Sequence, residues 1–252
     1  MPATVHLDQG QGPVVVLVHG VGAGPDSFRP LVELLDDRFR CVVVERPGPD
    51  GGGRAVPLAD QVDQLADLVT AIGGRGGRLV GVSGGATLGL LVALRHPDLF
   101  SDLLLHEPLV GHHAPILHSR FAAVAGEAAA DPIAALEAAI EVMGVTAWNR
   151  LGDDGRAWAL GRAARWQAEI PLFAAFDPTA DDLRSLADLH LVVSVGARSG
   201  PERAEAAEVL RELAGAAVVL VPGAANAAQL DAPSAFAQIV RSHQIAPTGG
   251  TR

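Results

Sequence analysis

The sequence predicts an α/β protein built on a doubly wound, mostly parallel β-sheet. Short apolar runs alternate with segments of helical periodicity along most of the chain, and this alternation is typical of parallel strands joined by crossover helices. The first run, residues 14–18 (VVVLV), is apolar at every position, which indicates a strand buried on both faces of a sheet. A length of 252 residues is enough for one such domain with a sizeable core.

The predicted elements follow one another in a regular order. Residues 58–72 carry apolar side chains at intervals of three and four, which is the spacing of an amphipathic helix. A loop rich in glycine and proline, residues 46–54, precedes that helix. The expected strands are 14–18, 41–44, 78–82, 102–105, 191–195 and 217–221. The expected helices are 27–35, 58–72, 84–95, 201–213 and 233–240.

One segment interrupts this alternation. Residues 112 to about 180 contain no strand-like run and are rich in Ala, Glu, Arg and Trp, which predicts several helices inserted after the strand that ends near His106. Loops at the carboxyl ends of parallel strands commonly build binding sites. We therefore expect a single domain over residues 1–252 with a helical lid over about 112–180. A purely structural excursion is the alternative.

Composition narrows the possible functions. A formal net charge of −10 argues against nucleic acid and anionic membrane surfaces as partners, because both need a basic patch. All nineteen basic residues are arginine and tyrosine is absent, so lysine and tyrosine chemistry is excluded. No apolar run reaches transmembrane length and no signal peptide is evident. We expect a soluble, cytoplasmic protein that acts on a small molecule without a metal or other cofactor.

The pattern Gly-x-Ser-x-Gly occupies residues 81–85, between an expected strand and an expected helix. In that context a sharp turn forces a strained backbone at Ser83, leaves no room for side chains at Gly81 and Gly85, and exposes the hydroxyl above the sheet. The helix N-terminus and the amide of Gly84 would face a developing oxyanion. Ser83 is therefore the candidate nucleophile, and a glycine-rich turn with an incidental serine is the alternative.

Residues 19–22 (HGVG) follow the first buried strand. Together with the Ser83 turn they make the chain resemble the α/β-hydrolase superfamily over essentially its whole length. The resemblance implies the α/β-hydrolase fold and a His-Gly-x loop, in which the amide of Val21 joins that of Gly84 in an oxyanion hole. Residues 20–24 (GVGAG) with Glu45 also imitate a dinucleotide-binding fingerprint, but that fingerprint leaves the Ser83 turn unexplained.

In this superfamily the catalytic residues follow the order serine, acid, histidine. Residues 221–233 (VPGAANAAQLDAP) resemble the family's closing pattern of Pro-Gly, two residues, His, six residues and Pro. Asn226 stands where the resemblance places the histidine, and Pro222, Gly223 and Pro233 fix the register. A carboxamide donates and accepts hydrogen bonds, whereas an imidazole also carries a proton near neutral pH.

The acid is assigned by the same resemblance. Many relatives place it in the turn that corresponds to residues 196–200 (GARSG), which has no carboxylate. The other position used in such enzymes is the end of the strand after the elbow helix, where Glu107 follows His106. Glu107 is therefore the candidate acid, and a loop carboxylate or arginine partner is its alternative role.

These features leave three functions open. Without a base, Ser83 is a poor nucleophile, although oxyanion stabilisation and binding survive. We expect an enzyme with a non-standard triad of Ser83, Glu107 and Asn226 that transforms a small carbonyl-containing molecule by cyclisation, isomerisation, elimination or decarboxylation, with Glu107 as a carboxylate base. One alternative is a serine esterase or lactonase-type hydrolase whose histidine has been replaced. The other is a non-catalytic ligand-binding or sensor protein. The bias towards Ala, Gly and Arg resembles that of proteins from high-GC actinobacteria and suggests specialised metabolism.

Overall fold

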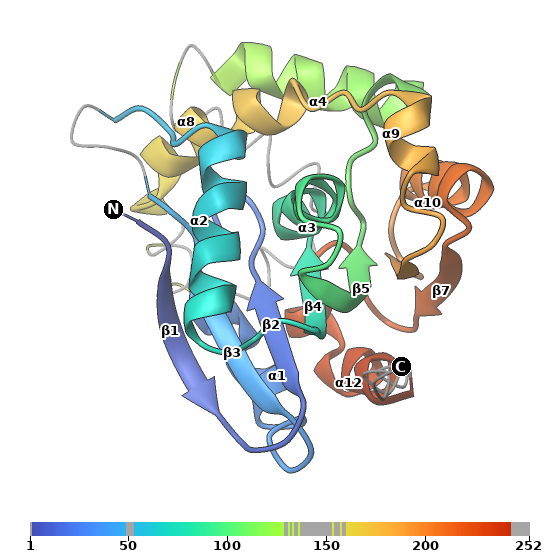
Figure 1. Ribbon diagram of the computed structural model, residues 1–252. Helices are drawn as coiled ribbons and strands as arrows, with labels where there is room; N and C mark the ends of the chain where they lie inside the picture. Colours follow the sequence, from blue (N-terminus) through green and yellow to red (C-terminus); the bar gives the residue numbers. More distant parts are fainter. Residues whose placement is uncertain are drawn as a thin grey trace.

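A seven-stranded β-sheet forms the middle of the molecule (Figure 1). The computed structural model describes residues 2–48, 53–128 and 160–242, together with five isolated residues between 131 and 157. The strand order is β1-β3-β2-β4-β5-β6-β7, and only the pairing of β1 with β3 is antiparallel. The strands are β1 (Thr4–Gln9), β2 (Val14–Val18), β3 (Arg40–Glu45), β4 (Gly77–Val82), β5 (Phe100–His106), β6 (His190–Gly196) and β7 (Ala217–Val221). The predicted doubly wound α/β class is confirmed.

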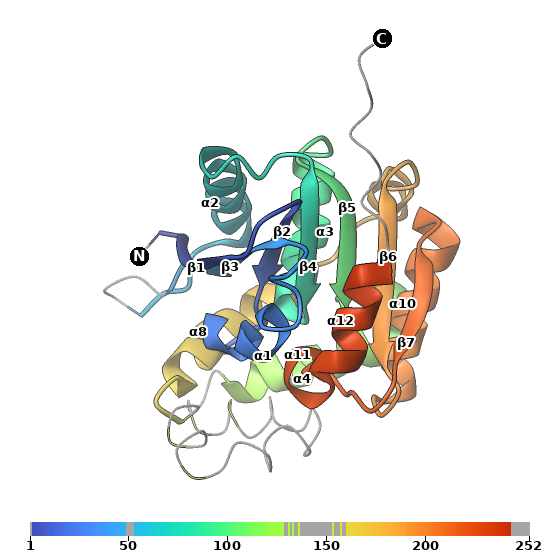
Figure 2. The same cartoon turned by 90° about the horizontal axis from the view of Figure 1, so that it is seen from below.

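Helices cover both faces of the sheet (Figure 2). One face carries α2 (Leu58–Ala71), α3 (Gly84–Arg95) and α10 (Pro201–Ala214), and the other carries α1 (Arg29–Val32) and α12 (Pro233–Ser242). Val16 and Val18 of β2 pack in the core beneath α2 and α3. Val15 and Leu17 of the same strand pack in the core beneath α1 and α12. Successive strand residues point to opposite faces, which explains why residues 14–18 are apolar throughout.

The described part of the insertion lies at the carboxyl ends of the strands. There α4 (Pro115–Ala128) and α8 (Ala163–Ala174) pack against each other, across the top of Figure 1. On α8, Trp166, Ile170 and Phe173 are buried and share one face of the helix. Most of residues 129–159, with Trp148 and Trp158, lie outside the described residues, and the lid over about 112–180 stays a prediction.

The remaining short elements connect these layers. They are η1 (Pro25–Phe28), η2 (Gly111–His113), α9 (Ala180–Arg184) and α11 (Ala228–Asp231). The helix expected over residues 27–35 is shorter than its pattern indicates, because η1 leads into the single turn of α1. Among the described helices, none combines the length and the apolar composition needed to cross a bilayer.

The sequence pattern does not predict β1, the antiparallel edge strand. Five of its six residues are exposed, so it lacks the apolar run that marks the inner strands. An edge strand pairs with one neighbour only and faces solvent along its other side. Its place in the sheet therefore depends on backbone pairing with β3, which no local side-chain pattern reveals.

A buried ion pair joins the centre of the sheet to the C-terminal helix. Arg78 in β4 and Asp102 in β5 bind each other, and their side chains are 0% and 2% exposed. Arg78 also donates a hydrogen bond to the backbone carbonyl of Val240 in α12. Because water does not reach this pair, loss of one partner leaves the other charge buried without compensation.

We predict that Asp102→Ala lowers the free energy of unfolding by about 3–5 kcal/mol, since it removes the buried carboxylate that Arg78 binds in the core. Urea denaturation at neutral pH measures this loss. Asp63→Ala is the matched control, because Asp63 pairs with Arg95 at the surface with both side chains nearly half exposed, and its loss should stay below about 1 kcal/mol. Equal, small losses in the two variants would contradict a structural role for the buried pair.

Candidate active site

Ser83 occupies the sharp turn between β4 and α3. Its backbone has φ 54° and ψ −120°, a strained region for any residue with a side chain. A Cβ on Gly85 would lie 2.1 Å from the carbonyl oxygen of Val18, and one on Gly81 would lie 2.5 Å from that of Gly85. Only glycine fits at both positions. The steep strand-to-helix turn expected from residues 81–85 is therefore present, with Ser83 at its tip.

Glu107 leaves the sheet at the end of β5, beside Ser83. The amide of Ser83 donates a hydrogen bond of 2.8 Å to the carbonyl of His106, so the two turns start from paired strands. Glu107 also has a positive φ, 52°. Its Oε1 accepts hydrogen bonds from the Gly196 amide, at 3.0 Å, and from the Ser199 hydroxyl. The end of β6 and the turn that follows it contain no carboxylate over residues 196–200. They instead supply two hydrogen-bond donors to the carboxylate of Glu107.

Glu107 is ionised at neutral pH. Burial alone would raise its pKa, but the charges of His106 and Arg203 and two side-chain hydrogen bonds outweigh burial and hold the pKa below its usual range. Burial lowers the pKa of His106 itself, so Arg203 is the partner that stays charged at neutral pH. Its Nε lies 3.6 Å from Glu107 Oε2. A carboxylate of low pKa is a fixed negative charge and a weak proton acceptor.

Asn226 lies in the loop after β7 and contacts this carboxylate directly. Its Nδ2 donates a hydrogen bond of 2.7 Å to Glu107 Oε2, and the side chain is buried. The preceding residue, Ala225, fixes the loop on both sides. Its amide donates to Asp231 Oδ2 at 2.9 Å, and its carbonyl oxygen lies 3.0 Å from His106 Nε2. The asparagine is therefore held at the acid, where the sequence pattern places a histidine.

The hydrogen bond to Glu107 determines which donor and acceptor groups of the Asn226 carboxamide remain for other partners in the site. One N–H of Nδ2 is engaged with Glu107, so the second N–H, a donor, and Oδ1, an acceptor, remain for the rest of the site. Ser83 and Asn226 do not hydrogen-bond to each other in the described structure. No atom of Asn226 takes up a proton near neutral pH, so this pair does not convert Ser83 into an activated nucleophile.

Residues 19–22, named here the oxyanion loop, follow β2 and pack on the Ser83 turn. A Cβ on Gly20 would lie 3.2 Å from Ser83 Cβ. A Cβ on Gly84 would lie 3.0 Å from the backbone nitrogen of Val21. This close approach brings the amides of Val21 and Gly84 onto adjoining segments beside the serine, and two preorganised N–H donors are what an oxyanion hole requires. The assignment of these two amides to an oxyanion hole stays a prediction.

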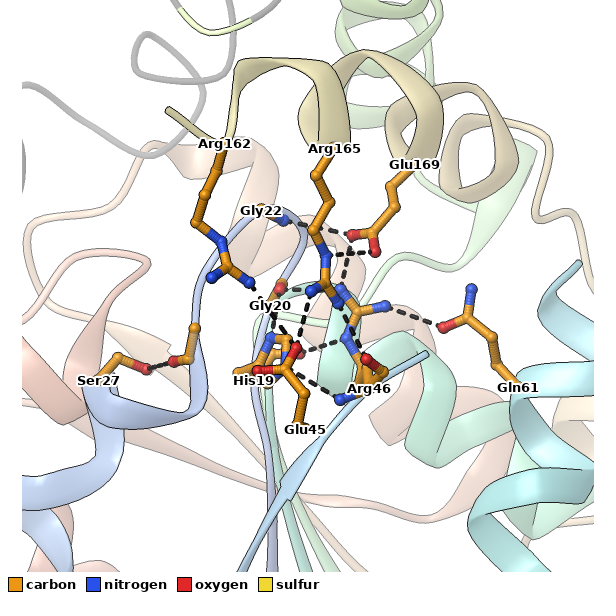
Figure 3. Close-up of polar contacts among 11 residues, drawn as sticks. His19, Gly20, Gly22, Ser27, Glu45, Arg46, Gln61, Arg162, Arg165 and Glu169 are labelled. Atoms are coloured by element: carbon orange, nitrogen blue, oxygen red, sulfur yellow. Dashed lines mark hydrogen bonds and ion pairs between the residues drawn. The ribbon is translucent and has the colours of Figure 1, made fainter. Parts of the chain in front are cut away.

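A buried charge network lies behind the oxyanion loop (Figure 3). Arg46, which directly follows β3, is its centre. The Arg46 Nε donates to the carbonyl of His19 at 2.9 Å, and Nη2 donates to the carbonyl of Gly20 at 3.0 Å. The same Nη2 lies 2.7 Å from the carboxylate of Glu169 in α8. Further members of the buried charge network are Glu45, Gln61 and Arg165. It joins the sheet, the oxyanion loop and the insertion.

His19 is a neutral member of this network. Burial is the main cause that lowers its pKa to about 4. Its Nε2 accepts a hydrogen bond of 3.2 Å from the Arg46 amide, and its Nδ1 lies 3.0 Å from the carbonyl oxygen of Gly20. The tautomer with its proton on Nδ1 satisfies both contacts. His19 therefore bridges the loop and the end of β3 without carrying charge.

Comparison with known proteins agrees with this geometry. A family model described as alpha/beta hydrolase fold matches residues 13–165, which is more than half of the chain. The chain belongs to the alpha/beta hydrolase family. A thermophilic esterase from Thermogutta terrifontis has a similar structure, with a TM-score of 0.78, 22% identity, and coverage of 95% of this chain and 91% of that one. A hydrolase from Pseudomonas aeruginosa superposes with a TM-score of 0.73, 20% identity and coverage of 94% and 92%.

Curated relatives of this alpha/beta hydrolase match over shorter stretches. An uncharacterized hydrolase, YraK, of Bacillus subtilis is 29% identical over 43% of this chain and 42% of its own length. A pimeloyl-[acyl-carrier protein] methyl ester esterase of Chromobacterium violaceum is 38% identical over 38% of this chain and 37% of its own length. The matched stretch thus spans about two fifths of each relative. The chain is similar to hydrolases and esterases over this stretch.

An apolar hollow of the hydrolase lies where the insertion meets the segment after β5. Its lining residues are Leu109, Val110, Gly111, Leu117, His118, Phe121, Phe173, Ala174 and Phe176. Phe173 also reaches the active site, since a Cβ on Gly84 would lie 3.3 Å from its ring. Trp166, a further aromatic residue of α8, packs against Gly22 instead of lining this hollow. In the described parts of the chain, no three His, Cys, Asp or Glu residues gather as they would around a metal ion.

Sequence reasoning misses the residues that support the site. Arg203 lies on α10, far along the chain from Glu107, and Glu169 lies in an insertion without any motif. The one available signal is Arg46, a charged residue that directly follows a strand of buried apolar residues. Such a position is costly for an unpaired charge, so it indicates a buried partner, but the sequence does not show which carboxylate provides it.

The neutral His19 makes the stability of the hydrolase depend on pH. Its pKa falls from 6.5 to about 4 on folding, so the unfolded chain binds a proton between these values that the folded chain does not, and stability falls as the pH drops through this window. We predict that, between neutral pH and pH 4.5, the unfolding free energy of the natural protein drops by about 2–3 kcal/mol more than that of His19→Gln.

Urea titrations at several pH values measure this difference, and the carboxylates remote from His19 cancel because both proteins contain them, whereas Glu45 and Glu169 interact with His19. His190→Gln, at an exposed position, is the control for removal of a histidine in general. A pH profile of His19→Gln that parallels the natural one would show that His19 does not stay neutral on folding.

Proposed function

We propose that this alpha/beta hydrolase binds a small carbonyl-containing organic molecule and transforms it by oxyanion stabilisation, without a base-activated acyl-serine. The observation that carries the proposal is the 2.7 Å hydrogen bond from Asn226 Nδ2 to Glu107 Oε2. It supports the proposal because Asn226, which cannot carry a proton near neutral pH, stands where the family resemblance expects the catalytic histidine. The oxyanion loop and the Ser83 turn remain in contact, and they supply the donors on which the proposed chemistry depends.

The substrate class follows from what surrounds the turn. The apolar hollow adjoins the N-terminus of α3 through Phe173, while the amides of Val21 and Gly84 would donate hydrogen bonds to a carbonyl oxygen. A pocket with apolar walls and a few convergent polar groups is typical of small-molecule sites. The lid role of residues 112–180 and a place in specialised metabolism belong to this proposal as well.

The contacts of Glu107 modify the expected chemistry. Both carboxylate oxygens are engaged, Oε1 by Gly196 and Ser199 and Oε2 by Asn226, and the pKa lies below its usual range, because these hydrogen bonds and nearby charge outweigh the effect of burial. These contacts favour Glu107 as the fixed partner of Asn226 over Glu107 as a carboxylate base. Cyclisation, isomerisation and elimination need a proton acceptor, and the described contacts of the site leave Glu107 poorly suited to be one.

Decarboxylation of a β-keto acid makes the smallest demand on this site. The electron pair of the breaking C–C bond moves onto the carbonyl oxygen, carbon dioxide leaves, and water later protonates the resulting enolate. No group of the protein has to remove a proton. The only charge that develops is on the oxygen, where two N–H donors stabilise it. Among the four reactions expected from the sequence, we therefore propose decarboxylation first.

A hydrolytic function is the second candidate, because the curated relatives carry hydrolase and esterase names. In that case the natural protein hydrolyses an ester or lactone slowly, through a bond from Ser83 to the substrate carbonyl that forms without a histidine base. Loss of a member of a serine triad typically costs a factor of about 10⁴ or more in rate. Both candidates share the oxyanion loop and differ in whether Ser83 forms a bond to the substrate.

We predict that Asn226→His raises hydrolysis of p-nitrophenyl acetate by at least about 100-fold, because an imidazole at this position restores a proton acceptor between Glu107 and Ser83. Release of p-nitrophenolate measures the rate. The double variant Ser83→Ala with Asn226→His is the control and should lose the gain. A single variant that is inert towards both this ester and a fluorophosphonate label would exclude an acyl-transfer arrangement of the Ser83 turn.

We predict that the natural protein releases carbon dioxide from a panel of medium-chain β-keto acids and that Ser83→Ala keeps the rate within about tenfold, because the proposed reaction forms no bond to the serine. Asn226→His should not raise this rate. If Glu107→Gln instead lowers the rate of carbon dioxide release by more than about 100-fold, this loss would indicate that the Glu107 carboxylate acts as a proton acceptor. Loss of all turnover in Ser83→Ala would favour the hydrolytic candidate.

A further inference from the structure

One carboxylate oxygen from the insertion contacts the oxyanion loop and its arginine at the same time. Glu169 Oε2 accepts a hydrogen bond of 3.3 Å from the Gly22 amide and lies 2.7 Å from Arg46 Nη2. The other oxygen, Oε1, binds Arg165 Nε at 2.8 Å, one helical turn away on α8. All of Glu169 is buried (Figure 3). A buried carboxylate that is fully engaged in this way has one defined orientation.

These contacts fix the two peptide groups on either side of Val21. In a trans peptide the C=O and the N–H point in opposite directions. The carbonyl of Gly20 accepts a hydrogen bond of 3.0 Å from Arg46 Nη2 and therefore points towards this arginine. The N–H of Val21, in the same peptide, points in the opposite direction. The following peptide is fixed through the Gly22 amide by Glu169. Both restraints converge on Glu169, since it also holds Arg46.

The same carboxylate is anchored through α8 to the end of β3. Arg165 Nη1 binds Glu45 Oε1 at 2.7 Å, and its Nη2 donates to the carbonyl of Arg46 at 3.2 Å. Trp166 lies against Gly22, where even a single Cβ would meet its ring at 1.9 Å. Two side chains of α8 thus contact the oxyanion loop at Gly22, the charged Glu169 and the aromatic Trp166.

We propose that Glu169 is a positioning residue, which sets the orientation of the oxyanion loop from α8 and directs the Val21 amide at the substrate carbonyl. This inference rests on the proposed function, because it assigns a task to the same loop. Stability alone does not require such a pair, since apolar residues of similar volume often replace a buried ion pair without loss. The insertion therefore contributes to catalysis from behind the active site.

The first test uses Asn226→His as the background and p-nitrophenyl acetate as the probe. Glu169→Gln keeps an acceptor oxygen but loses the charge, and Glu169→Ala removes both. We expect kcat to fall by about tenfold in the first and about 100-fold in the second, with KM within about twofold. Ile170→Ala is the matched control, because Ile170 is the buried neighbour of Glu169 on α8 and its truncation leaves a cavity but removes no charge or hydrogen bond.

The second test does not need turnover. Amide hydrogen exchange at Gly22, measured by NMR in the protein with Asn226, should accelerate at least about tenfold in Glu169→Gln and much less in Ile170→Ala. If Glu169→Ala does not fold, Glu169→Gln carries both tests. An unchanged kcat in Glu169→Gln, or an equal loss in Ile170→Ala, would overturn the positioning role. If Asn226→His is inert towards the ester, the hydrogen exchange of the Gly22 amide is the deciding measurement. Unchanged exchange in Glu169→Gln then overturns the positioning role of Glu169, whether or not the protein acts on carbonyl compounds.

Discussion

Two backbone hydrogen bonds just beyond the paired strands hold the site together. The Ser83 amide binds the carbonyl of His106 at 2.8 Å, and the Glu107 amide binds that of Ser194 at 3.0 Å. Ser83 and Glu107 are the only non-glycine residues of the described structure with positive φ. Such conformations cost on the order of 1–3 kcal/mol each and persist only where the surroundings enforce them. The sheet enforces them here, and both Asn226 and the oxyanion loop contact one of these two turns.

The site contains two buried carboxylates with different tasks. Glu107 is surrounded by donors from the turn after β6, from Asn226 and from Arg203. Glu169 is held between Arg46 and Arg165. In both cases burial would raise the pKa, and nearby arginine charge is prominent among the effects that outweigh it and keep the carboxylate ionised. One charge orients the residue opposite the serine, and the other orients the loop that would bind the carbonyl oxygen.

The fold and the residues of the turn could be predicted because local sequence encodes them. The all-apolar run at residues 14–18 marks a strand buried on both faces, and the glycines at 81 and 85 are required by backbone contacts that no side chain tolerates. The position of Asn226 follows from the spacing of its flanking prolines. Each of these signals lies within a short stretch of chain, which is why a single sequence reveals it.

The supporting residues could not be predicted, because their partners lie far away in sequence. Arg46 and Glu169 are separated by 123 positions, and Gly22 and Glu169 by 147. Neither spacing has a periodicity, and a charged residue on a helix usually indicates a solvated face. β1 escapes prediction for a related reason, since an exposed edge strand is defined by its neighbour β3 and not by its own pattern.

Asn226, at the position where the family resemblance predicts a histidine, separates the architecture of the site from its proton chemistry. An imidazole at this position donates one N–H to the acid and offers its second nitrogen to the serine. Asn226 keeps the first contact through one N–H of Nδ2, so Glu107 stays compensated, and in place of the second nitrogen it offers only the other N–H and Oδ1. What disappears is the ability to hold a proton near neutral pH. A chain under no demand to bind a carbonyl compound would have little reason to keep Glu107 buried, Ser83 strained and the oxyanion loop fixed, and this retention favours a reaction that uses the site without proton transfer.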